Sequence, residues 1–287
     1  MNARSGLPAV LTFLASSSLA ASPQENASPA SSDVTPMEMY EELEKAYDDA
    51  YQEFLAAYRA AETDDERQKI YDARYPNANE FVGDFVELAY DHPQTEAALL
   101  ALSWVVENAS GSPRLNETLL VLQNDYLDEE ELGPLAARLR YTTTGAAESF
   151  LRVLLEESPH RSVQGEACYA LAFQLKRKER TARTMLESGT VINAGMNPEL
   201  SFVAGADPDQ LLREAEEYFQ RTVMEYGDLP HRRGSLKVAA EGDLFEIRNL
   251  AIGQVAPEIQ GEDVQGSPFK LSDYRGKVVV LDFWGDW

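Results

Sequence analysis

From Met37 onward, apolar residues recur every three or four positions along the chain. This spacing places them on one stripe of a helix. Acidic side chains, among them Glu41, Asp48 and Glu53, occupy the opposite face. We expect the stripe to pack against other helices and the acidic face to be solvated. The stripe consists of Tyr40, Leu43, Tyr47, Ala50, Tyr51, Phe54, Leu55 and Tyr58.

Two later stretches carry helical signals of their own. Residues 95–106 are apolar nearly all round and follow Pro93, a residue that suits a helix start, so they predict a buried helix. Residues 145–158 again place apolar side chains on one stripe. The sequence therefore predicts a mainly α fold, with an acidic helical domain over residues 37–250 and no strands within it.

A further helix is predicted after residue 206. Asp207 suits an N-cap, Pro208 a first turn and Gly227 a helix end. The body is best described as a helical bundle that weakly resembles tetratricopeptide repeats, because an Ala-x-x-x-Leu/Phe spacing that runs on to a proline occurs twice. The residues that carry this weak resemblance are Ala147, Leu151 and Pro159, and Ala215, Phe219 and Pro230.

Charge and cysteine content exclude several classes of function. The chain has 25 Lys and Arg against 49 Asp and Glu, a formal charge of −24, and phosphate backbones and anionic lipids repel such a polyanion. We therefore expect no nucleic-acid partner. Cys168 is the single cysteine, and His92, His160 and His231 are far apart, so we expect neither a metal site nor a cofactor. Cys168 lies in an apolar helical segment without a basic neighbour, which predicts a buried, unreactive thiol.

The N-terminal residues have the pattern of an export signal over residues 1–20. Arg4 precedes a short apolar stretch, and Ser18 and Ala20 offer small side chains for cleavage. No stretch is long enough to span a bilayer, so no membrane span remains after removal of the signal. Residues 21–36 are rich in Ser, Pro and Ala, which predicts a disordered linker. We therefore expect a protein exported to the periplasm or cell envelope.

The helical pattern ends before residue 253. Residues 263–271 contain Gly266-Ser267-Pro268, which predicts a short hairpin. Residues 277–284 are rich in β-branched and aromatic side chains, which is typical of a strand covered on both faces. We expect this segment to form part of a parallel or mixed sheet flanked by helices.

The segment resembles the start of a thioredoxin-like domain. The resemblance is to the redoxin branch (AhpC/TSA), which includes peroxiredoxins and exported thiol-disulfide oxidoreductases of the TlpA and ResA kind. The aromatic run Phe283-Trp284-Gly285-Asp286-Trp287 favours the reductases, because it matches the residues directly before their Cys-x-x-Cys. The other matching residues are Gly253, Ala256, Pro257, Gly266, Phe269, Leu271, Ser272, Tyr274, Gly276 and Lys277.

The resemblance implies a reaction and a set of site residues. A thiolate at a helix N-terminus attacks a disulfide-bearing protein or exchanges with a small thiol, and a second cysteine resolves the mixed disulfide. Asp282 matches the buried acid behind the resolving cysteine, while Trp284 and Trp287 match the aromatic residues beside the active-site helix. In a buried strand Asp282 would be desolvated and suited to proton exchange with a thiol. The alternative is a strand-end residue that reaches solvent.

The catalytic cysteine pair of the family is not present in these 287 residues. We therefore expect residues 251–287 to be the N-terminal portion of a truncated domain, and the chain as written to be inactive. Two alternatives stay open. The chain is a helical-repeat interaction module with an unidentified protein partner, or it is a fragment cut at an in-frame UGA, through selenocysteine or mutation.

Overall fold

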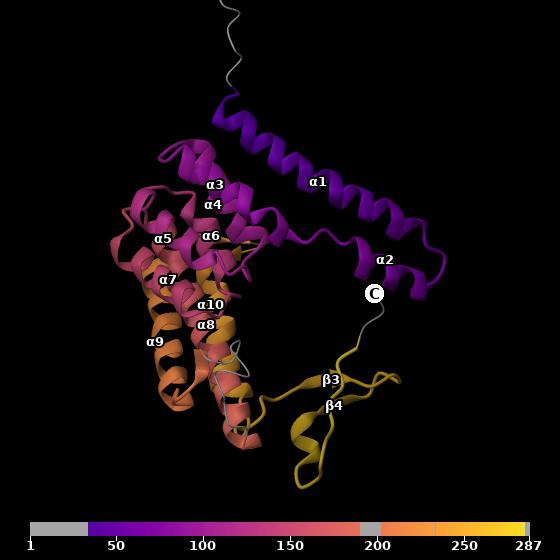
Figure 1. Ribbon diagram of the computed structural model, residues 1–287. Helices are drawn as coiled ribbons and strands as arrows, with labels where there is room; N and C mark the ends of the chain where they lie inside the picture. Colours follow the sequence, from indigo (N-terminus) through magenta and orange to yellow (C-terminus); the bar gives the residue numbers. More distant parts are fainter. Residues whose placement is uncertain (1–33, 190–201, 233, 285–287) are drawn as a thin grey trace, which may run out of the picture. The chain divides into compact units, whose positions relative to one another are not determined.

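The computed structural model describes residues 34–189, 202–232 and 234–284 (Figure 1). This part of the chain is mainly α, as predicted, and its strands are short. The helices are α1 Pro36–Ala60, α2 Asp64–Arg74, α3 Val82–Asp91, α4 Glu96–Asn108, α5 Leu115–Asp125, α6 Leu132–Leu139, α7 Gly145–Glu157, α8 Arg161–Ser188, α9 Pro208–Tyr226 and α10 Leu236–Phe245. The short elements are η1 Ala78–Glu80, β1 Pro230–His231, β2 Gly234–Ser235, η3 Glu246–Leu250, β3 Gln260–Glu262, β4 Pro268–Lys270 and η4 Leu271–Tyr274.

Side-chain caps explain where several helices begin. Thr95 accepts a hydrogen bond from the Ala98 N–H at the start of α4, and Asp207 accepts one from the Asp209 N–H at the start of α9. The cap predicted at Asp207 is therefore confirmed. Gly227 ends α9 as predicted, but its φ of −64° is right-handed. Glycine is required there by space, because a Cβ would lie 2.5 Å from the Val223 carbonyl oxygen.

The stripe of α1 packs into a small aromatic cluster, as predicted. Tyr47 of α1 meets Phe81 and Trp104 edge-on, with ring centroids 5.3 and 5.0 Å apart. Phe85 of α3 stacks on Trp104 of α4 at 4.0 Å. Such aromatic pairs add to the free energy gained by burial alone. The opposite, acidic face of α1 is exposed, in agreement with the sequence.

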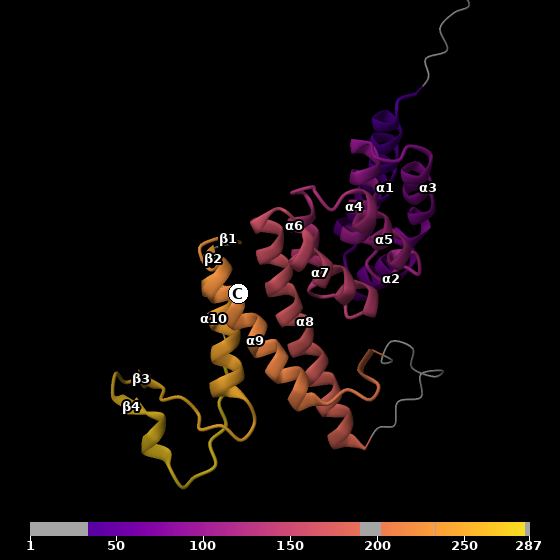
Figure 2. The same ribbon diagram turned by 90° about the vertical axis from the view of Figure 1, so that its left-hand side faces the viewer.

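A larger apolar cluster is built around the 28-residue helix α8. α8 contacts α6, α7, α9 and α10, and α9 runs along it (Figure 2). The close approach depends on Gly165, where a Cβ would lie 2.6 Å from Leu229 Cδ1 and 3.1 Å from Tyr226 Cβ. Cluster members from α4, α5, α7 and α9 include Leu102, Leu122, Phe150 and Phe219.

Two small antiparallel hairpins accompany the helices. β1 pairs with β2 through Pro230↔Ser235 and His231↔Gly234, so the prediction of no strands within residues 37–250 was wrong at this point. A hairpin this short carries no alternating apolar pattern and leaves no strand signal in the sequence. β3 pairs with β4 through Gly261↔Phe269, which confirms the hairpin predicted around Gly266.

The predicted domain boundaries are only partly covered by the described residues. The expected signal, residues 1–20, lies outside them, as does most of the expected linker. Thr35 caps α1 and Pro36 is its first residue, so the helical body begins at the end of the expected 21–36 linker. The boundary between 37–250 and 251–287 stays a prediction.

Candidate functional site

Two of the expected site residues, Asp282 and Trp284, fall in a segment without helix or strand. Residues 277–284 form no ladder in the described chain, so the strand predicted there is not formed. A strand needs a neighbour to accept its backbone hydrogen bonds, and within the described ranges β3 and β4 pair only with each other. Asp282 is exposed, as in the alternative of a residue that reaches solvent, and Trp284 is 82% exposed. Trp287 lies outside the described residues, and the role of these three residues stays a prediction.

The hairpin ahead of that segment is locally well defined. Leu271 N–H donates to the Ile259 carbonyl at 2.9 Å, and Glu258 Oε1 accepts from Ser272 N–H at 2.9 Å. Gly266 and Gly276 have φ values of 81° and 83°, a left-handed conformation that favours glycine. The backbone conformation therefore explains why glycine occupies these two positions of the motif.

Cys168 is fully buried, as predicted. Thr222 Oγ1 lies 3.3 Å from its sulfur, and the thiol donates to the Tyr218 carbonyl at 3.4 Å. Burial raises the pKa of the Cys168 thiol to about 11. A thiol in this environment is neutral near pH 7 and is a poor nucleophile.

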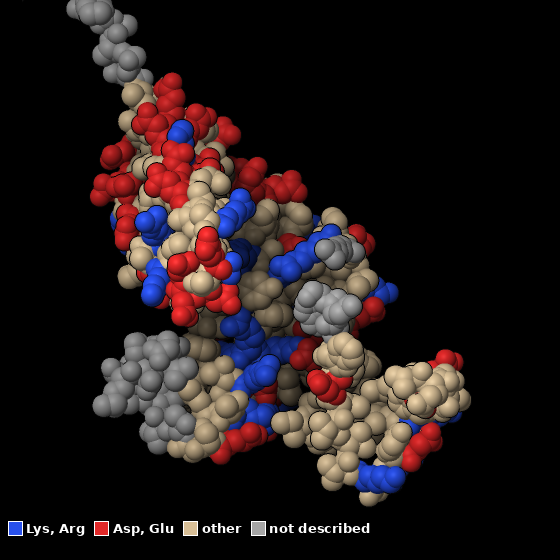
Figure 3. Space-filling model, turned by 90° about the vertical axis from the view of Figure 1, so that its right-hand side faces the viewer, with Lys and Arg blue, Asp and Glu red and all other residues tan. Residues whose placement is uncertain are grey.

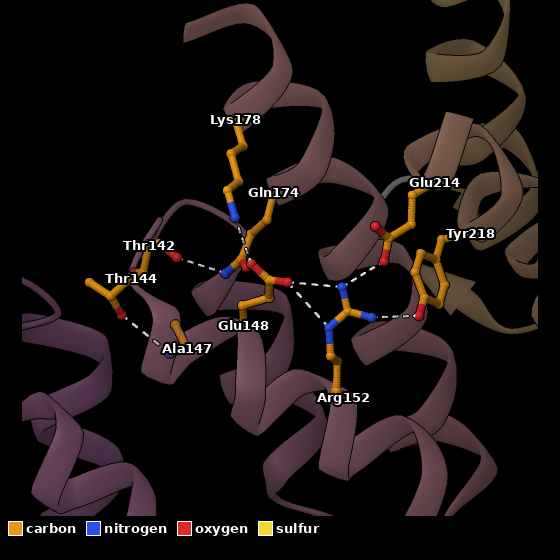
Figure 4. Close-up of polar contacts among 9 residues, drawn as sticks. All are labelled: Thr142, Thr144, Ala147, Glu148, Arg152, Gln174, Lys178, Glu214 and Tyr218. Carbon is orange, nitrogen blue, oxygen red and sulfur yellow. Dashed lines mark hydrogen bonds and ion pairs between the residues drawn. The ribbon is translucent and has the colours of Figure 1, made fainter. Parts of the chain in front are cut away.

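A network of charged side chains connects α7, α8 and α9 (Figure 4). Arg152 Nη2 lies 2.8 Å from Glu148 Oε1 and 2.6 Å from Glu214 Oε1, and its Nη1 donates to the Tyr218 hydroxyl at 2.8 Å. Lys178 Nζ lies 3.3 Å from Glu148 Oε2. Burial raises the pKa of Glu148, but the hydrogen bond from Arg152 and the charge of Lys178 outweigh it and hold the pKa below its usual value. Every charge of this network has a partner, which favours a structural role.

The loop before α7 is held by a buried amide. Gln174 of α8 donates to the Leu139 carbonyl at 2.8 Å and to the Thr142 carbonyl at 2.7 Å. Thr144 then caps α7 by accepting from the Ala147 N–H (Figure 4). A small pocket of about 70 Å³ next to this loop has little room beyond one or two waters. We assign this region to the stability of the bundle.

A second polar group was not expected from the sequence. His231 Nδ1 lies 2.9 Å from Glu166 Oε1, and its Nε2 lies 3.5 Å from Arg140 Nη1. Because a guanidinium can only donate, Nε2 accepts, and the imidazole proton is therefore on Nδ1, directed at Glu166. Arg140 Nε and Glu166 Oε2 are buried and have no hydrogen-bond partner in the described part of the chain. His231 is 65 positions from Glu166 and 91 positions from Arg140, so no local spacing in the sequence could indicate the group.

Metal binding and membrane crossing find no support in the described residues. No group of three or more His, Cys, Asp or Glu side chains there could hold a metal ion. Among the same residues, no helix has both the length and the apolar composition to cross a membrane.

The described residues thus define a mainly α protein followed by a short β-hairpin segment. No family model and no solved structure matches the chain. It is similar to "Thiol-disulfide oxidoreductase ResA" of Geobacillus kaustophilus (strain HTA426), 50% identical over 38 residues, which are 13% of this chain and 22% of that protein. The ResA protein of Geobacillus thermodenitrificans (strain NG80-2) is 47% identical over 38 residues, again 13% of this chain and 22% of that protein.

A longer match has a lower sequence identity. The ResA protein of Bacillus thuringiensis subsp. konkukian (strain 97-27) is 36% identical over 47 residues, 16% of this chain and 27% of that protein. The chain therefore spans about a quarter of the length of these curated relatives. The short similarity supports the resemblance to thiol-disulfide oxidoreductases.

Proposed function

We propose that residues 251–287 are the first part of a thioredoxin-like domain, and that the full-length protein is an exported thiol-disulfide oxidoreductase. The observation that carries this proposal is the identity of 36–50% to ResA proteins. The matched length of 38 residues is close to that of residues 253–287, where the family motif lies. The left-handed conformations of Gly266 in the hairpin and of Gly276 after η4 give the motif a physical basis.

The proposed reaction is disulfide exchange. A thiolate of the complete domain attacks one sulfur of a substrate disulfide, and the other substrate sulfur leaves as a thiolate and is protonated. A second thiolate of the domain then attacks the mixed disulfide, so the substrate is reduced to a dithiol while the domain is oxidised to a disulfide. Asp282 would exchange protons with the second thiol, and Trp284 and Trp287 would flank the active-site helix.

The reacting cysteine pair is not among the 287 residues of the chain. Their single cysteine, Cys168, is buried within the helical body and has a raised pKa. The chain as written is therefore inactive in this proposal, and catalysis requires cysteine or selenocysteine residues beyond Trp287. Substrates would be a disulfide-bearing protein or a small thiol, and the helical body would bind a further protein that the sequence does not identify.

Export to the periplasm or cell envelope is part of the same proposal. It is supported by the signal-like pattern of residues 1–20, in which a basic residue precedes a short apolar stretch and small residues. Fusing residues 1–36 to a reporter that is active only after export tests it. A reporter that stays inactive would contradict the localisation while leaving the proposed chemistry untouched.

Insulin reduction tests the assignment of the chemistry. We expect the 287-residue chain to show no turnover above background in the presence of dithiothreitol. Turnover that is lost in Cys168→Ser would place the reaction at Cys168 and overturn the proposal. The transcript beyond codon 287 provides the second test, in which a Cys or UGA codon followed three codons later by a Cys codon is expected. The absence of thioredoxin-like sequence there would also overturn it.

A further inference from the structure

An open pocket of about 380 Å³ lies where α4, α6 and the β1–β2 turn meet. Its volume is within the range of small-molecule sites. On the face drawn in Figure 3, Lys and Arg side chains gather near the centre, whereas Asp and Glu dominate the upper part of the view. The residues that line the pocket are Glu107, Pro134, Ala137, Arg138, Tyr141 and Arg232.

Positive charge is concentrated around Tyr141. The guanidinium carbon of Arg140 lies 4.5 Å from the centre of the Tyr141 ring, and that of Arg177 lies 6.0 Å from it. The Phe173 ring also meets it edge-on, with ring centroids 5.5 Å apart, and Tyr141 as a residue is still 44% exposed, which leaves part of it accessible to a ligand. Arg138 uses its Nε and Nη2 to donate to the Glu107 carbonyl, at 3.2 and 2.9 Å.

These arginines form no ion pair within the described chain, although the charge of Arg138 acts to lower the pKa of Glu107. Arg152, by contrast, pairs with two carboxylates. The lack of an ion pair with any described residue holds for Arg138 and Arg232, which line the pocket, and for Arg140 and Arg177, which lie beside the ring. This is unusual for a chain of net charge −24, in which carboxylates outnumber cations. The result is a local excess of positive charge that would attract an anion.

Two features that lower the stability of the fold occur at or next to this pocket. Arg140 is 3% exposed, its Nε has no hydrogen-bond partner among the residues that the structure describes, and its Nη1 contacts the His231 ring instead of a carboxylate. A buried guanidinium without a counter-ion is destabilising. Arg232, at the β1–β2 turn, has a φ of 45°, which is strained for a residue other than glycine. Strain and unpaired charge of this kind accumulate at binding sites.

We propose that this pocket binds a small molecule that carries an oxyanion group, either carboxylate or phosphate. Arg138 and Arg232 hold the oxyanion, and Tyr141 provides a flat surface for the rest of the ligand. Arg140 and Arg177 lie beside the ring and add positive potential without direct contact. This site is separate from the proposed thioredoxin-like chemistry and does not depend on it.

Glu107 is the one carboxylate among the described residues that line the pocket, and it opposes an anion there. Glu107 has a pKa raised by burial and by the charge of Glu44, while the charge of Arg138 opposes this rise. Its replacement by glutamine removes the negative charge at nearly the same volume. Glu107→Gln is therefore expected to bind the anion more tightly, the opposite of an arginine replacement.

Isothermal titration calorimetry of the 287-residue chain with citrate, and separately with inorganic phosphate, tests the site at low ionic strength. We expect one binding event per chain, weakened by added salt. Arg232→Asn should weaken it about tenfold, because a charge-assisted hydrogen bond is lost. Asparagine accepts a left-handed backbone better than arginine does, so this variant is expected to keep the fold, as checked by circular dichroism.

Arg213→Gln in α9 is the matched control, because Arg213 lines a different groove and forms no ion pair within the described chain. Binding should be unchanged in this variant. Binding of citrate alone assigns the site to carboxylates, and binding of both probes assigns it to oxyanions in general. The proposal is overturned if neither probe binds, if Arg232→Asn binds as the unmodified chain does, or if Arg213→Gln weakens binding equally.

Discussion

Arg152 Nη2 of α7 and Glu214 Oε1 of α9 are 2.6 Å apart and connect two helices, although the two residues are 62 positions apart in the sequence. The same nitrogen also contacts Glu148 of its own helix at 2.8 Å. Arg152 thus compensates two carboxylates, and its loss would leave Glu148 and Glu214 facing each other with less positive charge between them.

Arg152→Ala is expected to lower the free energy of unfolding by about 1–2 kcal/mol, since the side chains are partly exposed and solvent screens the pair. Urea denaturation measures this change. A double-mutant cycle with Glu214→Gln should show a coupling of a few tenths to about 1 kcal/mol. Arg213→Gln, which removes an arginine that forms no ion pair with any described residue, serves as the control, and equal losses in the two variants would contradict the role of Arg152.

Glu148 gives the fold a dependence on acid. Its pKa is lower in the folded protein than the usual 4.5, so the folded state binds this proton less readily than the unfolded state. The resulting stabilisation is complete above the usual pKa and is lost as the pH falls through the lowered value. The stability difference between the unmodified chain and Glu148→Gln should therefore shrink between about pH 7 and about pH 3. A difference that grows on acidification would contradict this sign.

Gly165 should not tolerate a larger side chain. Its Cβ would contact Leu229, Leu236 and Tyr226 at 2.6 to 3.1 Å. Because the leucine methyl groups can move and the Tyr226 Cβ cannot, we expect Gly165→Ala to cost about 1–2 kcal/mol in urea denaturation. Gly242→Ala in α10 is the matched control, since nothing lies within 4 Å of its Cβ. That variant should be stabilised by up to about 1 kcal/mol.

Cys168 should be unreactive in the folded chain. Its burial and its pKa of about 11 leave very little thiolate near neutral pH. We expect Ellman's reagent to label the native chain only slowly and the urea-unfolded chain at once. Cys168→Ser provides the blank. Rapid labelling of the native chain would mean that the α8–α9 contact opens far more readily than its packing indicates.

Residues 278–284 should limit solubility. Val280 and Phe283 are 88% and 82% exposed, and an unpaired apolar segment favours association between chains. Deleting residues 253–287 is expected to raise solubility and to leave the helical circular dichroism per residue unchanged or higher. The double variant Val280→Lys with Phe283→Lys should raise solubility without shortening the chain. Loss of cooperative unfolding on deletion would show that the segment belongs to the helical core.

The sequence predicts local features of this protein well and distant contacts poorly. The Asp207 cap and the apolar stripe of α1 depend on neighbours within a few positions, and both are confirmed. The strand over residues 277–284 was predicted from β-branched composition, but a strand also needs a pairing partner, which composition does not describe. The contact of His231 with Arg140 spans 91 positions and depends on how α6 and β1 pack on α8.

Thr35 and Glu38 close the first turn of α1 with hydrogen bonds that involve no residue before Thr35. The Thr35 hydroxyl accepts from Glu38 N–H at 3.2 Å, and Glu38 Oε2 accepts from Thr35 N–H at 2.7 Å. A peptidase that cuts anywhere upstream therefore releases the same first helix, with its cap intact. In the exported form that we propose, the position of cleavage can thus vary at no cost to the integrity of α1.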